Sequence, residues 1–235
     1  MAKKVNKTEE QFANVEESLS KAGLFVEKNQ KSLLIIIGSV VVLIGIFLAY
    51  SNYYVIPLEK QASADLFPAE FYIMDNNYEK ALHGDTLILK DSTIKIHKSL
   101  TEISQNYSST DAANLAYYYT AIAQLNLGEF ENAISSLNDF DTEDEILYSL
   151  KTGLIADANL ELGNTDKALE MYVDAATDYV NDFTTPYFMM KQAMVHEVNG
   201  DYSKSLEIYK IIKADYPNSR EGLSIEQYIS RAANN

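Results

Sequence analysis

The stretch LNLGEFENAISSL at residues 125–137 recurs as LELGNTDKALEMY at residues 160–172 and as HEVNGDYSKSLEIY at residues 196–209. The three copies align on a glycine, at Gly128, Gly163 and Gly200. Glycine tolerates the left-handed backbone conformation that ends a helix, so the chain can reverse within a few residues. The repeat therefore predicts pairs of antiparallel helices. Each pair leaves an apolar face that only a neighbouring pair covers, and we expect the pairs to stack.

Two further positions recur in each copy. A small residue follows each glycine and lets the second helix lie close to the first, at Ala133, Ala168 and Ser205, and a larger residue four positions later fills the space to the next unit, at Leu137, Tyr172 and Tyr209. A degraded copy, DNNYEKAL at 75–82, has Asn76 in place of the glycine. Segment 83–93 interrupts the period, and we expect a loop there, a helix over about 93–107 and no strand pairing.

Helix starts are expected at three places. Thr142-Glu143-Asp144-Glu145 fits a capping box, which predicts a helix start just before residue 143. Thr185-Pro186 fits a cap followed by a first-turn proline. Asn218-Ser219 predicts a terminal helix to about residue 233, whose stripe of Leu223, Tyr228 and Ile229 caps the stack.

This pattern resembles the tetratricopeptide repeat family, which has W-x2-L-G-x2-Y in the first helix, A-x3-F in the second and a closing proline. The second helices match through Ala133-x3-Leu137, Ala168-x3-Tyr172 and Ser205-x3-Tyr209, with Pro217 in the closing position. In the first helices the small residue is kept, at Ala121, Ala156 and Ala193. The resemblance implies an all-α solenoid of helix pairs with a C-terminal capping helix.

A long apolar segment precedes the repeats. No charged residue occurs from Ser32 to Leu58, and Leu33–Tyr50 is almost continuously apolar, long enough to cross a hydrocarbon core. The main alternative is a cleavable signal peptide, whose apolar region is shorter and ends in small residues. Here the run starts after thirty-one residues and ends in bulky Tyr50, Tyr53 and Tyr54. We therefore expect a single transmembrane signal-anchor helix over 32–56, ending near Pro57.

The flanking charges predict the orientation. Lys21, Lys28 and Lys31 precede the span, and no positive excess follows it. The positive-inside rule then places residues 1–31 in the cytoplasm and the repeat domain, 57–235, outside the cytoplasm. Residues 1–31 predict an amphipathic helix with Thr8 as its cap and an apolar stripe, formed by Phe12, Val15, Leu19, Ala22 and Val26. That helix either lies on the inner leaflet or docks a membrane partner, while Gly38, Gly45 and Ala49 allow close approach of a second helix in the membrane.

Composition narrows the function. The chain has no cysteine, which excludes disulfides, thiolate metal sites, cysteine nucleophiles and a lipid anchor on cysteine. Its net charge of −15 falls on the exterior part and makes nucleic acid an unfavourable partner, although it is compatible either with simple solubility or with a basic protein partner. His83, His97 and His196 are isolated, and no phosphate loop or nucleophile elbow occurs. We expect no enzyme activity, cofactor, metal or small-molecule substrate, and a structural role for His196.

The family resemblance implies a binding groove on the concave face, formed by exposed positions of the first helices. These are Tyr118, Ile122, Asn126, Gly153, Asp157, Glu161, Tyr187, Met190, Met194 and Glu197. The family's clamp for a C-terminal carboxylate needs Lys, Asn and Arg at these places. Tyr118, Gly153 and Met190 occupy the first of these places, so that clamp is absent. An apolar groove rimmed by acid suits extended or partly unfolded chains. The alternative is that several of these side chains pack against the terminal helix.

The layout of the whole chain carries a second resemblance. A cytoplasmic helix, one span and an acidic tetratricopeptide-like exterior resemble the YfgM-type ancillary subunit of the Sec translocon. This resemblance implies an accessory of protein export in the bacterial inner membrane, with Sec translocon subunits, periplasmic chaperones or client chains as partners. A cell-envelope scaffold that binds a fixed folded partner and a regulatory protein with its output in residues 1–31 stay open as alternatives.

Overall fold

A computed structural model describes residues 7–88 and 94–235. The chain divides into two compact units, Met1–Pro57 and Leu58–Asn235. The first unit contains α1, Lys7–Tyr50, followed by a π-helical turn at Ser51–Val55. The cap predicted at Thr8 and the stripe from Phe12 to Ala22 lie outside the described side chains.

Among the described residues, one helix is long and apolar enough to span a membrane, and its apolar segment lies in α1. Its side chains are exposed along the segment, as at Leu34, Leu43 and Phe47. A polar side chain within it is satisfied by the helix itself, since Ser39 Oγ donates to the Ile35 carbonyl at 2.8 Å. Internal satisfaction of this kind is what hydrocarbon requires of a polar group.

The sequence predicts that the helix ends near Pro57, but this is wrong: the helical backbone continues as α2, from Ile56 to Met74. Proline in a helix lacks one N–H and crowds the carbonyl four residues earlier. That carbonyl belongs to Tyr53, which lies in the π-helical turn Ser51–Val55. The wider turn relieves the crowding, so the proline does not terminate the helix.

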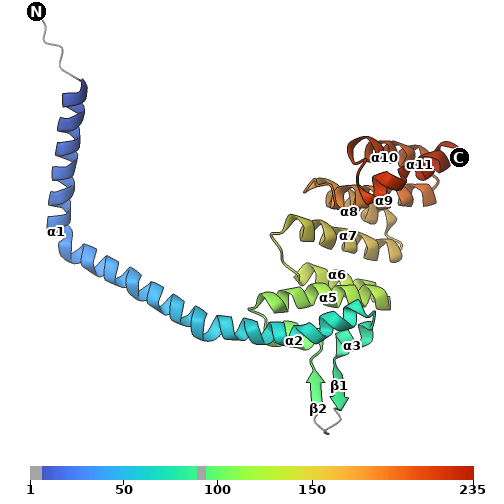
Figure 1. Cartoon of the computed structure of the whole chain (residues 1–235), viewed down its shortest axis with the longest axis horizontal. Helices are drawn as coiled ribbons and strands as arrows, with labels where there is room; N and C mark the ends of the chain where they lie inside the picture. Colours follow the sequence, from blue (N-terminus) through green and yellow to red (C-terminus); the bar gives the residue numbers. More distant parts are fainter. Residues whose placement is uncertain (1–6, 89–93) are drawn as a thin grey trace, which may run out of the picture. The chain divides into compact units, whose positions relative to one another are not determined.

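The second unit is a stack of helix pairs (Figure 1). After α2 come α3 (Tyr78–His83), β1 (Asp85–Ile88), β2 (Ile94–His97), α4 (Leu100–Asn106), α5 (Asp111–Leu127), α6 (Phe130–Asp139), α7 (Glu145–Glu161), α8 (Thr165–Thr177), α9 (Thr184–Val198), α10 (Tyr202–Asp215) and α11 (Arg220–Ala233). Helices α5–α6, α7–α8 and α9–α10 form the three predicted pairs, and α11 packs on the last of them. The predicted all-α solenoid with a C-terminal capping helix is confirmed.

The turns follow the sequence pattern closely. Gly128, Gly163 and Gly200 have φ of 79°, 78° and 79°. Asn76, at the equivalent place in the degraded copy, has φ of 56°, which asparagine tolerates better than most residues. The predicted left-handed helix stops are therefore present in all four copies.

Small residues mediate the helix contacts, as predicted. Ala133, Ala168 and Ser205 are completely buried, and so are Ala121, Ala156 and Ala193. The larger residues Leu137, Tyr172 and Tyr209 are also buried. Gly153 shows the closest approach: a Cβ at this position would lie 1.9 Å from the ring of Phe188.

The segment expected to be a loop forms a β-hairpin instead. Strands β1 and β2 pair antiparallel, with Asp85 opposite His97 and Ile88 opposite Ile94. The missed signal is the alternation of apolar and polar residues in Ile94-Lys95-Ile96-His97, typical of a strand. The following helix starts at Leu100 rather than near 93, because Ser99 accepts a hydrogen bond from the Glu102 amide at 3.0 Å and its own amide donates to the Glu102 carboxylate at 3.0 Å.

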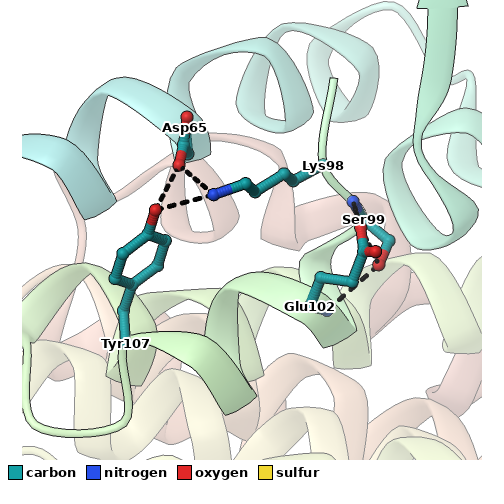
Figure 2. A network of polar contacts seen from close by, with 5 residues as sticks. All are labelled: Asp65, Lys98, Ser99, Glu102 and Tyr107. Atoms are coloured by element: carbon teal, nitrogen blue, oxygen red, sulfur yellow. Dashed lines mark hydrogen bonds and ion pairs between the residues drawn. The ribbon is translucent and has the colours of Figure 1, made fainter. Parts of the chain in front are cut away.

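A polar network fixes the end of the hairpin to α2, as Figure 2 shows. Asp65 on α2 accepts hydrogen bonds from Lys98 Nζ at 2.7 Å and from the Tyr107 hydroxyl at 2.5 Å, and Lys98 Nζ also donates to Tyr107 at 2.7 Å. Burial raises the pKa of Asp65, but the hydrogen bonds from Lys98 and Tyr107 outweigh it, and the pKa lies below the ordinary value.

Two predicted helix starts are wrong by one or more residues, and one is confirmed. Helix α7 is capped by Asp144, whose carboxylate accepts from the amides of Ile146 and Leu147, so it starts after residue 143. Helix α9 already includes Thr185, because Asn181 accepts from the Thr184 amide at 2.7 Å. Ser219 caps α11 as predicted, but Leu223 is 78% exposed and Ile225 takes its expected place in the core.

Candidate functional site

An open cavity lined by residues of all three helix pairs has a volume of about 870 Å³. We call it the groove. Its lining comes mainly from α5, α7 and α9: Leu125, Asn126, Gly128, Phe130, Leu154, Asp157, Leu160, Glu161, Thr165, Tyr172, Lys191, Met194, Val195, Val198 and Asn199. The helix pairs stack side by side, and this brings residues from three repeats to one surface.

An ion pair lies in the groove between neighbouring first helices. Lys191 Nζ on α9 donates to both carboxylate oxygens of Asp157 on α7, at 2.6 and 2.7 Å. The Tyr172 hydroxyl on α8 also donates to Asp157. Burial and then the negative charge of Asp157 raise the pKa of Tyr172 strongly, so this phenol stays protonated. The Lys191 ammonium also lies 5.3 Å from the ring centroid of Tyr187.

In this arrangement Asp157 and Lys191 neutralise each other's charge. Most of the side chains beside this ion pair in the groove lining are apolar. Val198 is 88% exposed and Met194 is 40% exposed, and Leu125, Leu154 and Leu160 continue the apolar wall. Glu161 and Asn126 are exposed polar residues in the same lining. The groove is thus chemically suited to an apolar segment that also carries a polar or basic group.

Four of the residues predicted for the groove line it: Asn126, Asp157, Glu161 and Met194. The others take different positions. Tyr118 packs against Phe140 with ring centroids 5.2 Å apart. Ile122 is half-buried, and its carbonyl accepts from the Asn126 side chain at 2.8 Å.

The remaining predicted residues lie nearer the C-terminal end. Tyr187 packs on Phe188 and lines a separate cavity of about 220 Å³ with Leu150 and Arg220. Met190 is 8% exposed in a core cluster with Tyr209 and Ile225. Glu197 also contacts α11, because its carboxylate forms an ion pair with Arg231. The alternative raised by the sequence, packing against the terminal helix, thus describes Met190 and Glu197.

Sequence reasoning missed Lys191, Leu154, Tyr172 and Val198 in the groove lining. A signal was available for Lys191. Asp157 lies six residues before Gly163, and Lys191 lies nine residues before Gly200, so Lys191 stands one helical turn earlier in its repeat. Stacking of the repeats brings the two first helices side by side, so opposite charges at these positions can meet. The prediction considered too few positions in each turn and therefore missed it.

No group of three or more His, Asp or Glu side chains that could hold a metal is found in the described part of the chain. His196 is buried in α9, with its Nδ1 at 3.7 Å from an Asp201 carboxylate oxygen. Its burial fits the structural role predicted from the repeat register.

Comparison with known proteins supports the repeat interpretation. The family model of the tetratricopeptide repeat matches residues 115–143 and 187–219, which cover most of α5–α6 and α9–α10. No curated protein and no solved structure matches the chain. The chain therefore contains tetratricopeptide-like repeats, and such repeats indicate a module for protein–protein interaction.

Proposed function

We propose that this chain is a membrane-anchored, non-enzymatic module that holds an extended apolar segment of a partner protein in its groove. The observation that carries the proposal is the groove lining, in which Asp157 and Lys191 neutralise each other beside an open apolar wall. A volume of about 870 Å³ accommodates several side chains of a bound segment. An exposed glutamate, Glu161, favours a basic residue in that segment.

The membrane part of the proposal divides the chain into a cytoplasmic amphipathic helix at 1–31, a signal-anchor span at 32–56 and an extracytoplasmic domain at 57–235. Its support is the apolar helix and the lysines before it. Protease added to osmotically opened cells is expected to remove residues beyond about 60. Protection of those residues would reverse the orientation.

The finer proposal is an accessory of protein export at the bacterial inner membrane, associated with the Sec translocon and handing clients to periplasmic chaperones. Its support is the resemblance of the layout to the YfgM-type family, together with a groove suited to unfolded segments. The competing proposal is a cell-envelope scaffold that holds one folded partner. The adaptable side chain of Met194 at the groove surface favours varied clients over one fixed surface.

A matched pair of variants tests the groove. Val198→Asp places a charge on the apolar wall at a side chain that is 88% exposed, so the fold is expected to tolerate it. Leu223→Asp makes the same change at a side chain 78% exposed on α11, away from the groove lining. Photo-crosslinking from position 194 in membranes is expected to capture proteins, and Val198→Asp is expected to lower that capture about ten-fold while Leu223→Asp leaves it unchanged. Equal capture in both variants would refute the groove.

The identity of the captured proteins separates the two finer proposals. Export clients of many sequences at position 194, with channel subunits crosslinked to residues between about 20 and 55, are expected for an export accessory. A single folded envelope protein at position 194 is the outcome for a scaffold and contradicts the export role.

A further inference from the structure

A second cavity lies where the capping helix α11 meets the last two helix pairs. It has a volume of about 220 Å³, and we call it the α11 pocket. Its lining includes Leu150, Asp182, Phe183, Tyr187, Arg220 and Glu221. The leucine comes from α7, the two aromatic residues come from the α8–α9 link and from α9, and the last two residues come from the first turn of α11. Helix α11 therefore forms part of a cavity wall as well as covering the end of the stack.

The α11 pocket and the groove lie along the same two helix faces. On each of α7 and α9, the lining residues follow steps of four, three and four positions, which places them on one side of the helix. These residues are Leu150, Leu154, Asp157 and Glu161 on α7, and Tyr187, Lys191, Met194 and Val198 on α9. The first residue of each set lines the α11 pocket, and the other three line the groove. The two cavities are therefore consecutive parts of one surface.

The ion pair of the groove stands between the two cavities. Lys191 Nζ bonds to Asp157 in the groove lining and also lies 5.3 Å from the ring centroid of Tyr187, which lines the α11 pocket. A segment that occupies both cavities must cross this pair. The bound segment therefore meets an apolar wall, then a polar site and then a second pocket.

The size and the charge of the α11 pocket limit what it can hold. A cavity of roughly 150 Å³ takes up one benzene molecule, so about 220 Å³ is enough for one leucine, methionine or phenylalanine side chain. Two carboxylates, of Asp182 and Glu221, outnumber the Arg220 guanidinium in the lining. The excess of negative charge favours a basic residue next to the apolar one, as Glu161 does in the groove.

Helix geometry gives the spacing between the two apolar side chains. Leu150 and Glu161 are eleven residues apart on α7, which corresponds to about 16 Å along the helix. An extended chain advances about 3.3 Å per residue, and alternate side chains point to the same side. Two side chains four residues apart therefore point to the same side and lie about 13 Å from each other. The side chain midway between them faces Asp157 and Lys191.

We infer that the α11 pocket holds a second apolar side chain of the segment that occupies the groove. The two apolar residues are four positions apart, and a polar residue stands midway between them against the Asp157–Lys191 pair. This inference rests on the proposed function, because it names the sequence pattern that the groove recognises. A partner segment then reads apolar, any, polar, any, apolar, with a basic residue nearby.

Synthetic peptides test the spacing. The full-length chain in nanodiscs of zwitterionic phospholipid is titrated into fluorescein-labelled Gly-Ser peptides that carry one lysine, and empty nanodiscs control for binding to lipid. A peptide with two leucines four residues apart is expected to bind about ten-fold more tightly than a peptide with one leucine, because a second apolar side chain is buried. Leucines two residues apart are expected to give no gain, since the second one meets the ion pair. Equal affinity at both spacings would overturn the inference.

A matched pair of variants tests the α11 pocket itself. Phe183 and Val180 are both 67% exposed in the α8–α9 link, but only Phe183 lines the pocket. Phe183→Asp is expected to weaken binding of the two-leucine peptide about ten-fold and to change binding of the one-leucine peptide less than about two-fold. Val180→Asp is expected to leave both unchanged. Equal affinity of the two variants for the two-leucine peptide would remove the α11 pocket from the binding surface.

Val198→Asp separates this inference from the proposed function. It alters the groove and is expected to weaken binding of both peptides. If Val198→Asp weakens binding and Phe183→Asp does not, the groove stands and only the α11 pocket is rejected. If Val198→Asp has no effect, or if no peptide binds, the groove itself is rejected. Photo-leucine at each of the two positions, read by mass spectrometry, is expected to label residues near 183–187 from one position and near 194–198 from the other; labels near 194–198 from both would contradict the inference.

Discussion

Two networks of the same three residue types lie in different parts of the repeat domain. In the first, Asp65 accepts from Lys98 and Tyr107 where the hairpin returns to the helices; in the second, Asp157 accepts from Lys191 and Tyr172 in the groove. The first joins α2, the link after β2 and the end of α4, and the second joins three consecutive helices of the regular array. The same three types of side chain therefore form a network in two different structural contexts.

The surroundings determine what each network contributes. Helices α7, α8 and α9 are already held by tight apolar contacts, of which Gly153 against Phe188 is the closest. The hairpin interrupts the repeat, and its apolar Ile94 and Ile96 are exposed, so polar contacts at its base carry more of its attachment. We infer that the Asp65 network mainly fixes structure, while the Asp157 network mainly shapes the groove surface.

The largest effect is expected from Gly153→Ala, which tests the apolar contact in the regular array. The added Cβ would lie 1.9 Å from the buried Phe188 ring, so α7 and α9 must move apart. Overpacking of this kind costs about 1–3 kcal/mol, measured as the free energy of unfolding in denaturant. The double variant G153A/F188L is expected to recover part of the loss because it removes the colliding ring. Unchanged stability in Gly153→Ala would mean that this contact does not hold the array.

Asp65→Asn and Asp157→Asn form the next pair, and they compare the two networks directly. Asp65→Asn is expected to lower the free energy of unfolding by about 1–2 kcal/mol, the usual contribution of charged hydrogen bonds reduced for partial exposure. It is also expected to speed amide hydrogen exchange in β1 and β2. Asp157→Asn is expected to leave exchange in the hairpin unchanged. It frees the Lys191 ammonium inside the groove and is expected to weaken crosslinking of apolar segments at position 194. Faster hairpin exchange in both variants would remove the distinction.

The regular array was predictable from the sequence because its physics is local. Gly128, Gly163 and Gly200 stop their helices by backbone conformation alone, and the small residues five positions later fix the pair. The hairpin was missed because its strands are four residues long and each depends on the other. The groove was predictable only in part: Met190 and Glu197 face α11, and that packing depends on a helix some thirty residues further along the chain.

Tyr172→Phe is expected to have a smaller effect. It removes one hydroxyl donor to Asp157 but keeps the ring in its buried place beside Phe188. Loss of one such bond costs about 1 kcal/mol, and Asp157 keeps Lys191 as its partner. Because the pKa of Tyr172 is raised, an alkaline absorbance titration is expected to show fewer phenols with delayed ionisation in the variant than in the wild type.

The smallest expected effect is an acid-dependent contribution of Asp65 to stability. Its pKa in the folded chain lies below the ordinary value of 3.8, so the folded state binds a proton less readily than the unfolded state does. The resulting stabilisation is fully present above that ordinary value and is lost as the pH falls through the lowered pKa. The difference in unfolding free energy between wild type and Asp65→Asn is therefore expected to be constant from neutral pH to about 5 and to shrink below 4. Comparison with the variant cancels the other carboxylates, among them Asp85 and Asp201, whose pKa values are also lowered by lysine partners. A difference that stays constant down to pH 2 would mean that the carboxylate charge of Asp65 is not what holds Lys98 and Tyr107, and the first network would then fix the hairpin by packing, as the regular array does.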